Sequence, residues 1–393
     1  MTVGLFAFYL SQQPDLLRDA TRRDFITVYV GGQIVLKGQL THLYDIPLQT
    51  QLAYAATVPY PPALLPNVYP PWNSYLLAAL AWLPYDLAYW LWFLLNLAVA
   101  AWAIYGLLLL TRPSATDRPV LLLAAWGFAP LFHSLWQGQM SVIALLGLTG
   151  AVLMFRRGAD QAAGLWLLLV LFKTQLVPLI GIALLIWRKP RAVISFVLGS
   201  SVLLAGSLLL SGNWIRALLP FLQSGLDDEA RLGYTLGMAN WRGLLYVLIG
   251  NDTSPLAHNL ETLLVTTSLI LVAFLCWPYS RWGRADNQVR FALAAILLLL
   301  VSPHLYIHDV VVVLLPGFLL WRASTSALAL QPTAILHRLR WLLGLGPVVF
   351  YAMQIWHPPF FQIGAWYLVL VLALAFATRS LFTPADSQLP PVA

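Results

Sequence analysis

Long apolar runs, separated by charged or Pro/Gly-rich breaks, recur along the chain and limit its possible folds more than any other feature. Of its 393 residues, 60% are hydrophobic and 9% are charged, whereas soluble domains carry roughly a quarter charged residues. Such a chain is an integral membrane protein. The runs fall at about 1–13, 73–83, 86–110, 119–135, 140–155, 161–187, 192–211, 258–278, 289–302, 308–321, 339–356 and 361–378.

Several of these runs are shorter than the roughly 20 residues that a helix needs to cross a bilayer. The short runs lie beside polar residues, which favours broken or re-entrant helices that line a cavity. Lys173 and Pro178 interrupt the run at 161–187, which predicts two short helices there. We therefore predict an all-α polytopic membrane fold, with about 11–13 transmembrane helices when short and re-entrant ones are included.

Composition also excludes several classes of protein. The 22 Lys and Arg residues are scattered over loops between apolar runs, so we expect no nucleic-acid partner. The single cysteine, Cys276, rules out an intrachain disulfide. We expect one transmembrane domain over residues 1–380, followed by a disordered Pro-rich tail at 381–393.

The basic residues predict an orientation, because cytoplasmic loops of membrane proteins are enriched in Lys and Arg. The clusters that can share one side are Arg112 with Arg118, Arg156 with Arg157, Arg188 to Arg191, Arg281 to Arg290, Arg322 to Arg340, and Arg379. If the N-terminus is cytoplasmic, that side is the cytoplasm. The opposite side then holds the first external loop at 14–72, the Gly138-Gln139 turn, the 212–257 loop and the 303–309 turn. This predicts a multi-pass protein of a bacterial cell membrane, with its site on the non-cytoplasmic face.

The first external loop contains a polar interval, Arg18 to Asp45, in a chain with few charges elsewhere. After Asp24, apolar and small residues recur at three- and four-residue spacing, which predicts an amphipathic helix at the membrane interface. These residues are Phe25, Val28, Tyr29, Gly32 and Val35. A partly desolvated carboxylate at Asp24 can act as a general base, because its pKa is drawn toward neutrality. A helix N-cap, or a surface partner for Arg22 or Arg23, is the alternative.

Three more polar residues stand at the edges of apolar runs. Tyr69, in Tyr69-Pro70-Pro71, either positions substrate or anchors a rigid aromatic loop. Gln139, at the tip of a tight turn, either contacts a sugar or hydrogen-bonds within its loop. Lys173 lies in an apolar run, where a lysine costs a few kcal/mol. It either pairs with a phosphate or extends to the interface.

Two further segments contain groups suited to phosphate. Asn240 and Arg242 offer an amide and a guanidinium, and the latter suits bidentate phosphate binding. A salt bridge from Arg242 to the acidic cluster at 227–229 is equally open.

His304 and His308 would share a face if their segment were helical, and with Asp309 they offer metal ligands. Because Pro303 interrupts the helix and no other ligand set is evident, we favour histidines that donate to a phosphate, with Asp309 orienting one of them. A purely structural network is the alternative.

Taken together, these residues resemble glycosyltransferase family 87, within the GT-C superfamily of polytopic enzymes that use polyprenyl-phosphate sugars. The matching elements are Asp24-Phe25 with Tyr29, Gly38 with Leu43-Tyr44-Asp45, Tyr69-Pro70-Pro71, Gly138-Gln139, Phe172-Lys173, and Ser302-Pro303-His304 with His308-Asp309. The ordered set spans residues from about 20 to 315. Thr174 departs from the pattern, because the family often has proline after the lysine.

The resemblance implies transfer of a hexosyl unit, taken as mannosyl, from a polyprenyl-phosphate donor to a hydroxyl of a glycolipid or polysaccharide acceptor. Asp24 would be the general base of an inverting reaction that needs neither cofactor nor metal. The residues assigned to the donor phosphate are Lys173, Arg242, His304 and His308, and those assigned to substrate positioning are Tyr29, Tyr69, Gln139, Asn240 and Asp309. We expect Asp24 and the His304–His308 turn to line one cavity, within about 12 Å of each other.

A lipid or small-solute transporter or flippase is the competing interpretation, since broken helices and an intramembrane lysine suit it as well. Such proteins commonly contain internal repeats, and the sequence shows no convincing one. Its polar residues also concentrate at one face.

Overall fold

The computed structural model describes residues 24–58, 67–219, 238–250, 254–280, 285–330, 332–356, 363–378 and 381. The run predicted at 1–13, the interval 18–23, the acidic cluster at 227–229 and nearly all of the tail lie outside these residues. Within the described part, the only β pairing is an isolated bridge between Met238 and Tyr306.

The remaining elements are helices, with η denoting a 3₁₀ helix. The first half contains α3 (Phe25–Leu36), η2 (Leu40–His42), α4 (Ile46–Thr57), α5 (Pro71–Ala78), η3 (Leu80–Trp82), α6 (Tyr85–Thr111), α7 (Asp117–Trp126), α8 (Ala129–Gln137), α9 (Ser141–Arg156), α10 (Asp160–Leu167), η4 (Leu168–Phe172), η5 (Thr174–Leu176) and α11 (Val177–Trp187). The second half contains α12 (Pro190–Ser211), α14 (Trp241–Ile249), α15 (Pro255–Cys276), α16 (Asn287–Val301), η7 (Asp309–Val313), α17 (Leu314–Leu330), α18 (Ala334–Trp356) and α19 (Ile363–Ala377).

Helix length and composition identify the membrane-spanning elements. Among the described residues, four helices are long and apolar enough to cross a bilayer: Tyr85–Thr111, Pro190–Ser211, Pro255–Cys276 and Asp309–Leu330. The pair α7 and α8, bent by 42°, makes a fifth if it is one span, and six further apolar helices have 10–17 residues. The all-α polytopic membrane fold is therefore confirmed. The predicted 11–13 helices included short and re-entrant ones, and several apolar runs in the described part of the chain do form short helices.

The predicted interruption at 161–187 is present. Lys173 leaves helical geometry, with φ of −133° and ψ of 89°, and separates η4 from η5. Pro178 lies in the first turn of α11, where a missing N–H leaves no helical hydrogen bond unmade. Two helices therefore replace one, as the lysine and proline predicted.

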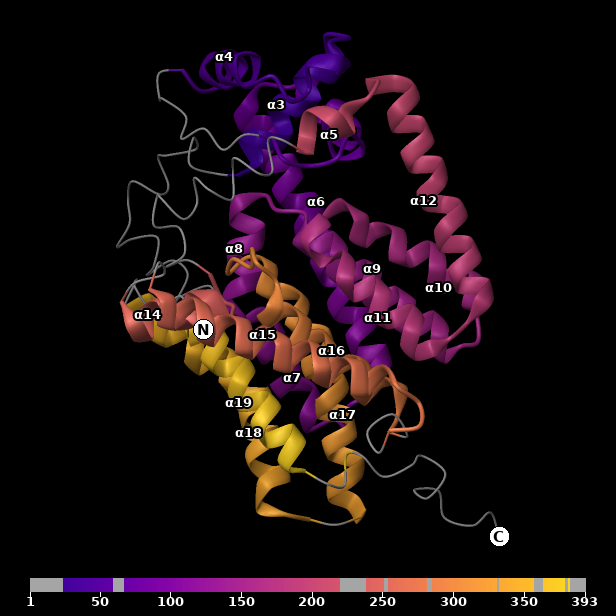
Figure 1. Cartoon of the computed structure of the whole chain (residues 1–393), viewed down its shortest axis with the longest axis vertical. Coiled ribbons are helices and arrows are strands. Elements are labelled where there is room, and N and C mark those ends of the chain that lie inside the picture. Colours follow the sequence, from indigo (N-terminus) through magenta and orange to yellow (C-terminus); the bar gives the residue numbers. More distant parts are fainter. Residues whose placement is uncertain are drawn as a thin grey trace.

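Helices α3, α4 and α5 form a group at one end of the molecule, and α17 and α18 reach the other end (Figure 1). Contrary to the predicted amphipathic pattern, α3 is buried on nearly all sides, including Phe25 to Gly32. The reason is its sequence FITVYVGGQIVL, which has no charged residue, together with a cluster of aromatic rings around Phe25. The ring of Phe25 lies 5.7 Å from that of Tyr89 and 6.4 Å from that of Trp92, both on α6.

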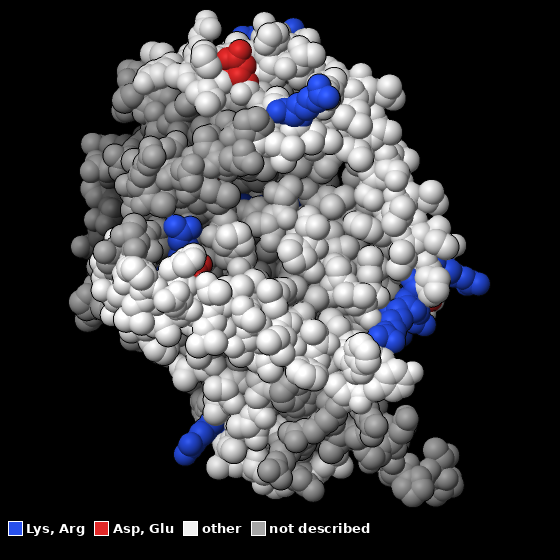
Figure 2. All heavy atoms as spheres, viewed as in Figure 1, with Lys and Arg blue, Asp and Glu red and all other residues white. Residues whose placement is uncertain are grey.

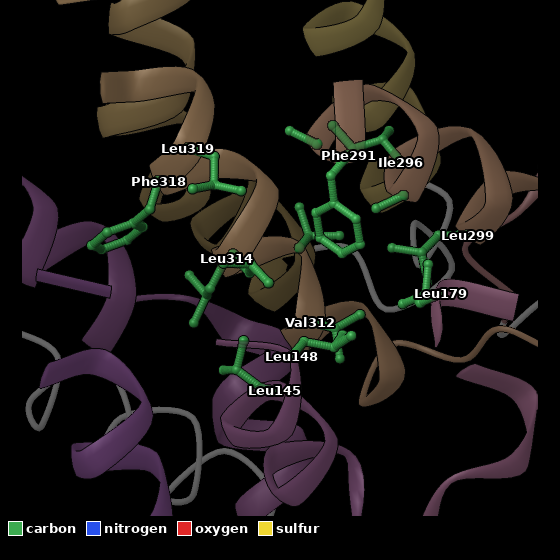
Figure 3. Packing of buried hydrophobic residues seen from close by; sticks show 14 of the residues in the cluster. Leu145, Leu148, Leu179, Phe291, Ile296, Leu299, Val312, Leu314, Phe318 and Leu319 are labelled. Atoms are coloured by element: carbon green, nitrogen blue, oxygen red, sulfur yellow. The ribbon is translucent and has the colours of Figure 1, made fainter. Parts of the chain in front are cut away.

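The main core lies between helices that are far apart in sequence. Leucines of α9, Leu179 of α11 and Phe291 of α16 pack against residues of η7 and α17 (Figure 3). Helix α16 is buried from Val289 to Leu297. This core holds the ends of α9, η5 and η7 in fixed relation to each other.

Basic residues at the opposite end of the bundle cap helix ends. Arg156 and Arg322 both donate to the carbonyl of Leu110, near the end of α6. Arg188 and Arg290 both donate to the carbonyl of Cys276, at the end of α15. Four of the basic clusters seen in the sequence thus meet at helix ends, while much of the face in Figure 2 has no charged side chain.

Candidate active site

Asp24 precedes the first turn of α3 and is half-buried. Its carboxylate accepts a hydrogen bond from the Nε2 amide of Gln139, a residue 115 positions later in the chain. The predicted helix N-cap position is therefore present, but the side chain makes no capping hydrogen bond to α3. Its carboxylate is instead directed to Gln139, in the turn after α8.

The turn after α8 carries Gln139 to this position. Gly138 ends α8 with a φ of +71°, a backbone conformation that favours glycine. A Cβ atom on Gly138 would lie 2.7 Å from the Cβ of Phe25, so no larger residue fits without a shift. The indole of Trp92 donates to the Gly138 carbonyl over 2.8 Å. The turn is thus fixed against the residue that follows Asp24.

Lys173 lies behind Gln139 and is 1% exposed. Its Nζ donates to Oε1 of Gln139 and lies 3.0 Å from Oδ1 of Asp309. Neighbouring groups stabilise the helix break at Lys173: Asn73 donates to the Phe172 carbonyl over 2.8 Å, and Trp72 donates to the Leu171 carbonyl over 3.2 Å. Carbonyls freed by the break are therefore paired within the protein.

Asp309 is fully buried and has several partners besides Lys173. The hydroxyl of Ser141 donates to its Oδ1 over 2.7 Å, and the amide of Gln175 lies 3.4 Å from its Oδ2. Nε2 of His308 is also 3.4 Å from Oδ2. A buried carboxylate needs such partners, since an unpaired one is costly.

Tyr69 completes the arrangement. Its hydroxyl donates to Oε1 of Gln139 over 2.9 Å, and its ring lies beneath the Lys173 ammonium. The backbone N–H of Tyr69 donates to the side chain of Asn67, whose own N–H donates to Gln49 of α4. We call Asp24, Tyr69, Gln139, Lys173, His308 and Asp309 the polar network.

Asp24 and His308, at the two ends of the polar network, have pKa values shifted in opposite directions. Burial raises the pKa of the Asp24 carboxyl to about 6, against the opposing effects of the Lys173 charge and the Gln139 hydrogen bond. The charge of His304 also lowers this pKa, and that of Asp309 raises it. Burial lowers the pKa of His308 to about 3, although Asp309 opposes the shift. At neutral pH, Asp24 is therefore an ionised but proton-accepting carboxylate, and His308 is a neutral donor.

The structure does not bring every predicted residue into the polar network. Tyr29 donates to the Leu83 carbonyl over 2.7 Å, and its ring packs against Tyr85 within the aromatic cluster. Asn240 caps α14 and donates to the Ser302 carbonyl over 2.8 Å, so it holds the turn that contains His304. Arg242 lies in the first turn of α14 and is half-buried.

Lys173 and His308 were predicted to bind the donor phosphate. In the structure both are buried and their side chains are directed to Asp309, because a buried carboxylate is stable only when it is paired with donors. His304 is half-buried and its ring packs edge-on against Tyr306 at 4.7 Å.

Residues 302–308 form bends, turns and the bridge to Met238. His304 and His308 therefore do not share a helix face, in line with the interruption expected at Pro303. Among the described residues, no group of three or more His, Cys, Asp or Glu side chains is arranged to hold a metal ion.

Sequence reasoning missed Ser141, Asn73 and Gln175, which contact the polar network or support the break beside it. Each is an uncharged polar residue at the start of an apolar helix or beside the Lys173 break. That position is the one signal that pointed to them, and it is shared by many residues with no such contact.

The chain is similar to a known protein family. A model of glycosyltransferase family 87 matches residues 67–303 of the 393. No curated protein and no solved structure matches the chain. Tyr69, Gln139 and Lys173 lie inside the matched range, whereas Asp24, His308 and Asp309 lie outside it. With more than half of its length matched and an all-α polytopic fold, the chain belongs to glycosyltransferase family 87, a family of GT-C type membrane glycosyltransferases.

Proposed function

We propose that this membrane glycosyltransferase moves a hexosyl unit, taken as mannosyl, from a polyprenyl-phosphate donor to a hydroxyl of a glycolipid or polysaccharide. The reaction takes place on the non-cytoplasmic face of the cell membrane and inverts the anomeric configuration. The single observation that carries this proposal is the half-buried Asp24 carboxylate, which has a pKa raised to about 6 and is hydrogen-bonded by Gln139. A base poised near the working pH is the most effective proton acceptor.

In the proposed reaction, Asp24 takes the proton of the acceptor hydroxyl while its oxygen attacks the anomeric carbon. The bond between that carbon and the phosphate oxygen breaks, and polyprenyl phosphate leaves with the electron pair. Its added negative charge needs donors held in place beforehand. His304 and Arg242 suit this role better than Lys173 and His308, because they are only half-buried.

The position of the site in a lipid-exposed bundle also supports a lipid-linked donor. In the most apolar stretch of helix α12, only 6% of the residues are buried inside the protein, so most of the surface of this helix is available to lipid. Such a surface admits a polyprenyl chain from the membrane, while exclusion of water around the buried polar network limits hydrolysis of the donor.

Asp24→Asn tests the proposal in membrane vesicles supplied with radiolabelled polyprenyl-phosphate mannose. We expect transfer to fall by roughly 100-fold or more, because general base catalysis contributes about that much. Asp86→Asn, at an exposed position in the first turn of α6, is the matched control and should retain full transfer. Undiminished transfer by Asp24→Asn, at normal protein levels, would move the base role to Asp45 or Asp309 or remove it altogether.

A further inference from the structure

We infer that Gln139 is a positioning residue whose amide is locked in one orientation by Lys173 and Tyr69, so that its N–H always faces Asp24. Lys173 then acts on Asp24 through this amide and through its charge, and does not bind the donor phosphate. This inference rests on the proposed function, in which Asp24 is the general base.

The orientation of the amide follows from the chemistry of its neighbours. A glutamine side chain offers one acceptor oxygen and one donor nitrogen. Lys173 can only donate, and its Nζ and the Tyr69 hydroxyl both donate to Oε1 of Gln139. Reversing the amide would place its N–H against the ammonium and its oxygen against the Asp24 carboxylate. Both contacts would then be repulsive, so only the observed orientation is stable.

Lys173 is itself held by Asp309. The two charged groups are 3.0 Å apart and their side chains are 1% and 0% exposed. Removing Lys173 from this pair to meet a phosphate would leave a buried, unpaired carboxylate, which is strongly unfavourable. Ser141 fixes the carboxylate from α9, the same helix that follows Gln139 in the chain. The ammonium therefore stays behind Gln139.

The backbone of Gln139 is equally fixed. Gly138 holds a left-handed conformation between Phe25 and Trp92, where any Cβ atom would collide with Phe25. Since Phe25 follows Asp24 directly, the same contact sets the spacing between the Gln139 amide and the Asp24 carboxylate. Both the position and the polarity of the donor are thereby determined before substrate binds.

Other groups also act on the Asp24 carboxylate within the described part of the chain. Lys173 reaches it from the helix break, Asp309 from η7, His304 from the turn after α16, and Tyr69 from the segment before α5. Of these, Lys173 favours the ionised form most strongly, followed by the Gln139 hydrogen bond. Changing the amide alone leaves every one of these charges in place, which makes Gln139 the informative position.

Gln139→Glu separates the roles of the two ends of this side chain. It retains oxygen acceptors for Lys173 and Tyr69 but replaces the N–H facing Asp24 by a second carboxylate oxygen. We expect the proton shared by positions 24 and 139 to be retained to a pH at least about one unit higher than the Asp24 proton of the wild type. Gln139→Met, which removes the donor without adding charge, should shift the titration in the same direction by less.

The measurement is an infrared pH titration of the protonated carboxyl band in nanodiscs, which requires no substrate. Each spectrum is corrected by the same variant carrying Asp24→Asn, so that only the signal depending on Asp24 remains. Gln137→Glu is the matched control: it adds the same charge two residues away, at the end of α8, and should shift the titration far less than Gln139→Glu. An unchanged titration in both Gln139 variants would overturn the inference.

Transfer assays distinguish this inference from the proposed function. We expect Gln139→Glu to lower kcat/KM by about 2-fold or more at pH 7, since a one-unit rise from about 6 halves the ionised fraction of the base. Activity should recover at higher pH, with an unchanged KM for donor. A shifted infrared titration together with normal transfer by Asp24→Asn would support the polar network and refute the base role. An inactive Asp24→Asn together with an unshifted titration would support the base role and refute the positioning role of Gln139.

Discussion

At the scale of single residues, the polar network combines groups that are each unfavourable alone. Burying Asp309 or Lys173 singly would cost several kcal/mol, and the pair is stable because each group satisfies the other. Asp24 differs because it keeps part of its surface exposed and pairs with a neutral amide. The pKa of Asp24 is raised to about 6, whereas the fully buried Asp309 is paired with the Lys173 ammonium. This difference between the two carboxylates supports the proposal that Asp24 is the base.

The raised pKa of Asp24 predicts a pH dependence of both activity and stability. Transfer should fall as the pH drops through about 6, where the base becomes protonated. Because folding favours the protonated form, the stability contributed by this proton is complete below about pH 4 and is lost as the pH rises through 6.

Asp24→Asn removes this titration. Thermal unfolding monitored from pH 4 to 8 should therefore show the variant at least as stable as the wild type above pH 6. A variant clearly less stable than the wild type at pH 7 would contradict the assignment, since it would mean that the ionised carboxylate stabilises the fold.

At the scale of elements, broken helices create the polar network. The break at Lys173 turns what would be one long helix into two, and it directs a lysine inward at the same level as the Gly138 turn and η7. A continuous helix would leave no free carbonyls, and here the freed carbonyls of Leu171 and Phe172 are bonded by α5. Helix α5 therefore supports the network through the break at Lys173. Its Asn73 is the position at which this support can be tested.

Asn73→Leu should destabilise the protein by about 1–3 kcal/mol, because the buried carbonyl of Phe172 loses its donor. Asn96→Leu is the matched control. Asn96 is equally buried, on α6, and its amide atoms have no hydrogen-bond partner among the described residues. Its replacement should be neutral or stabilising. Thermal unfolding in detergent measures both, and equal effects of the two variants would show that the Asn73 bond does not support the break.

At the scale of the whole molecule, the polar network and the basic helix ends lie at opposite ends of long helices. Helix α6 has 27 residues and is about 40 Å long. It begins beside the aromatic cluster around Phe25, and near its other end Arg156 and Arg322 donate hydrogen bonds to the Leu110 carbonyl. Basic residues concentrate on the cytoplasmic side of membrane proteins. This asymmetry supports the proposed placement of Asp24 on the non-cytoplasmic face.

Cysteine labelling in intact cells tests this orientation. In a Cys276→Ala background, Gln51→Cys on α4 should react with a membrane-impermeant maleimide, because it is exposed at the end that holds Asp24. Ala115→Cys, exposed between α6 and α7, should react only after the cells are permeabilised. The reverse pattern would place the site in the cytoplasm, and labelling of both after permeabilisation confirms that each cysteine is reactive.

The sequence alone determined the class of protein, the approximate positions of most apolar helices, and the helix break at Lys173. These depend on local properties: apolar runs form helices because the bilayer offers no other partner for the backbone, and Pro178 and Gly138 begin and end helices through their own backbone geometry. The sequence also indicated Asp24, Gln139, Lys173 and Asp309 as polar residues of interest, and the family resemblance led to the prediction of a base at Asp24.

Only the tertiary structure decided which of these residues meet. Gln139 is 115 positions from Asp24, and Ser141 is 168 positions from Asp309. Pairing over such separations depends on how the core helices pack, not on any local pattern. Packing directed Tyr29 to the Leu83 carbonyl and buried nearly all sides of α3, although the spacing of its residues had predicted one exposed face. It also paired Lys173 with Asp309, because two opposite charges excluded from water are stable only in contact.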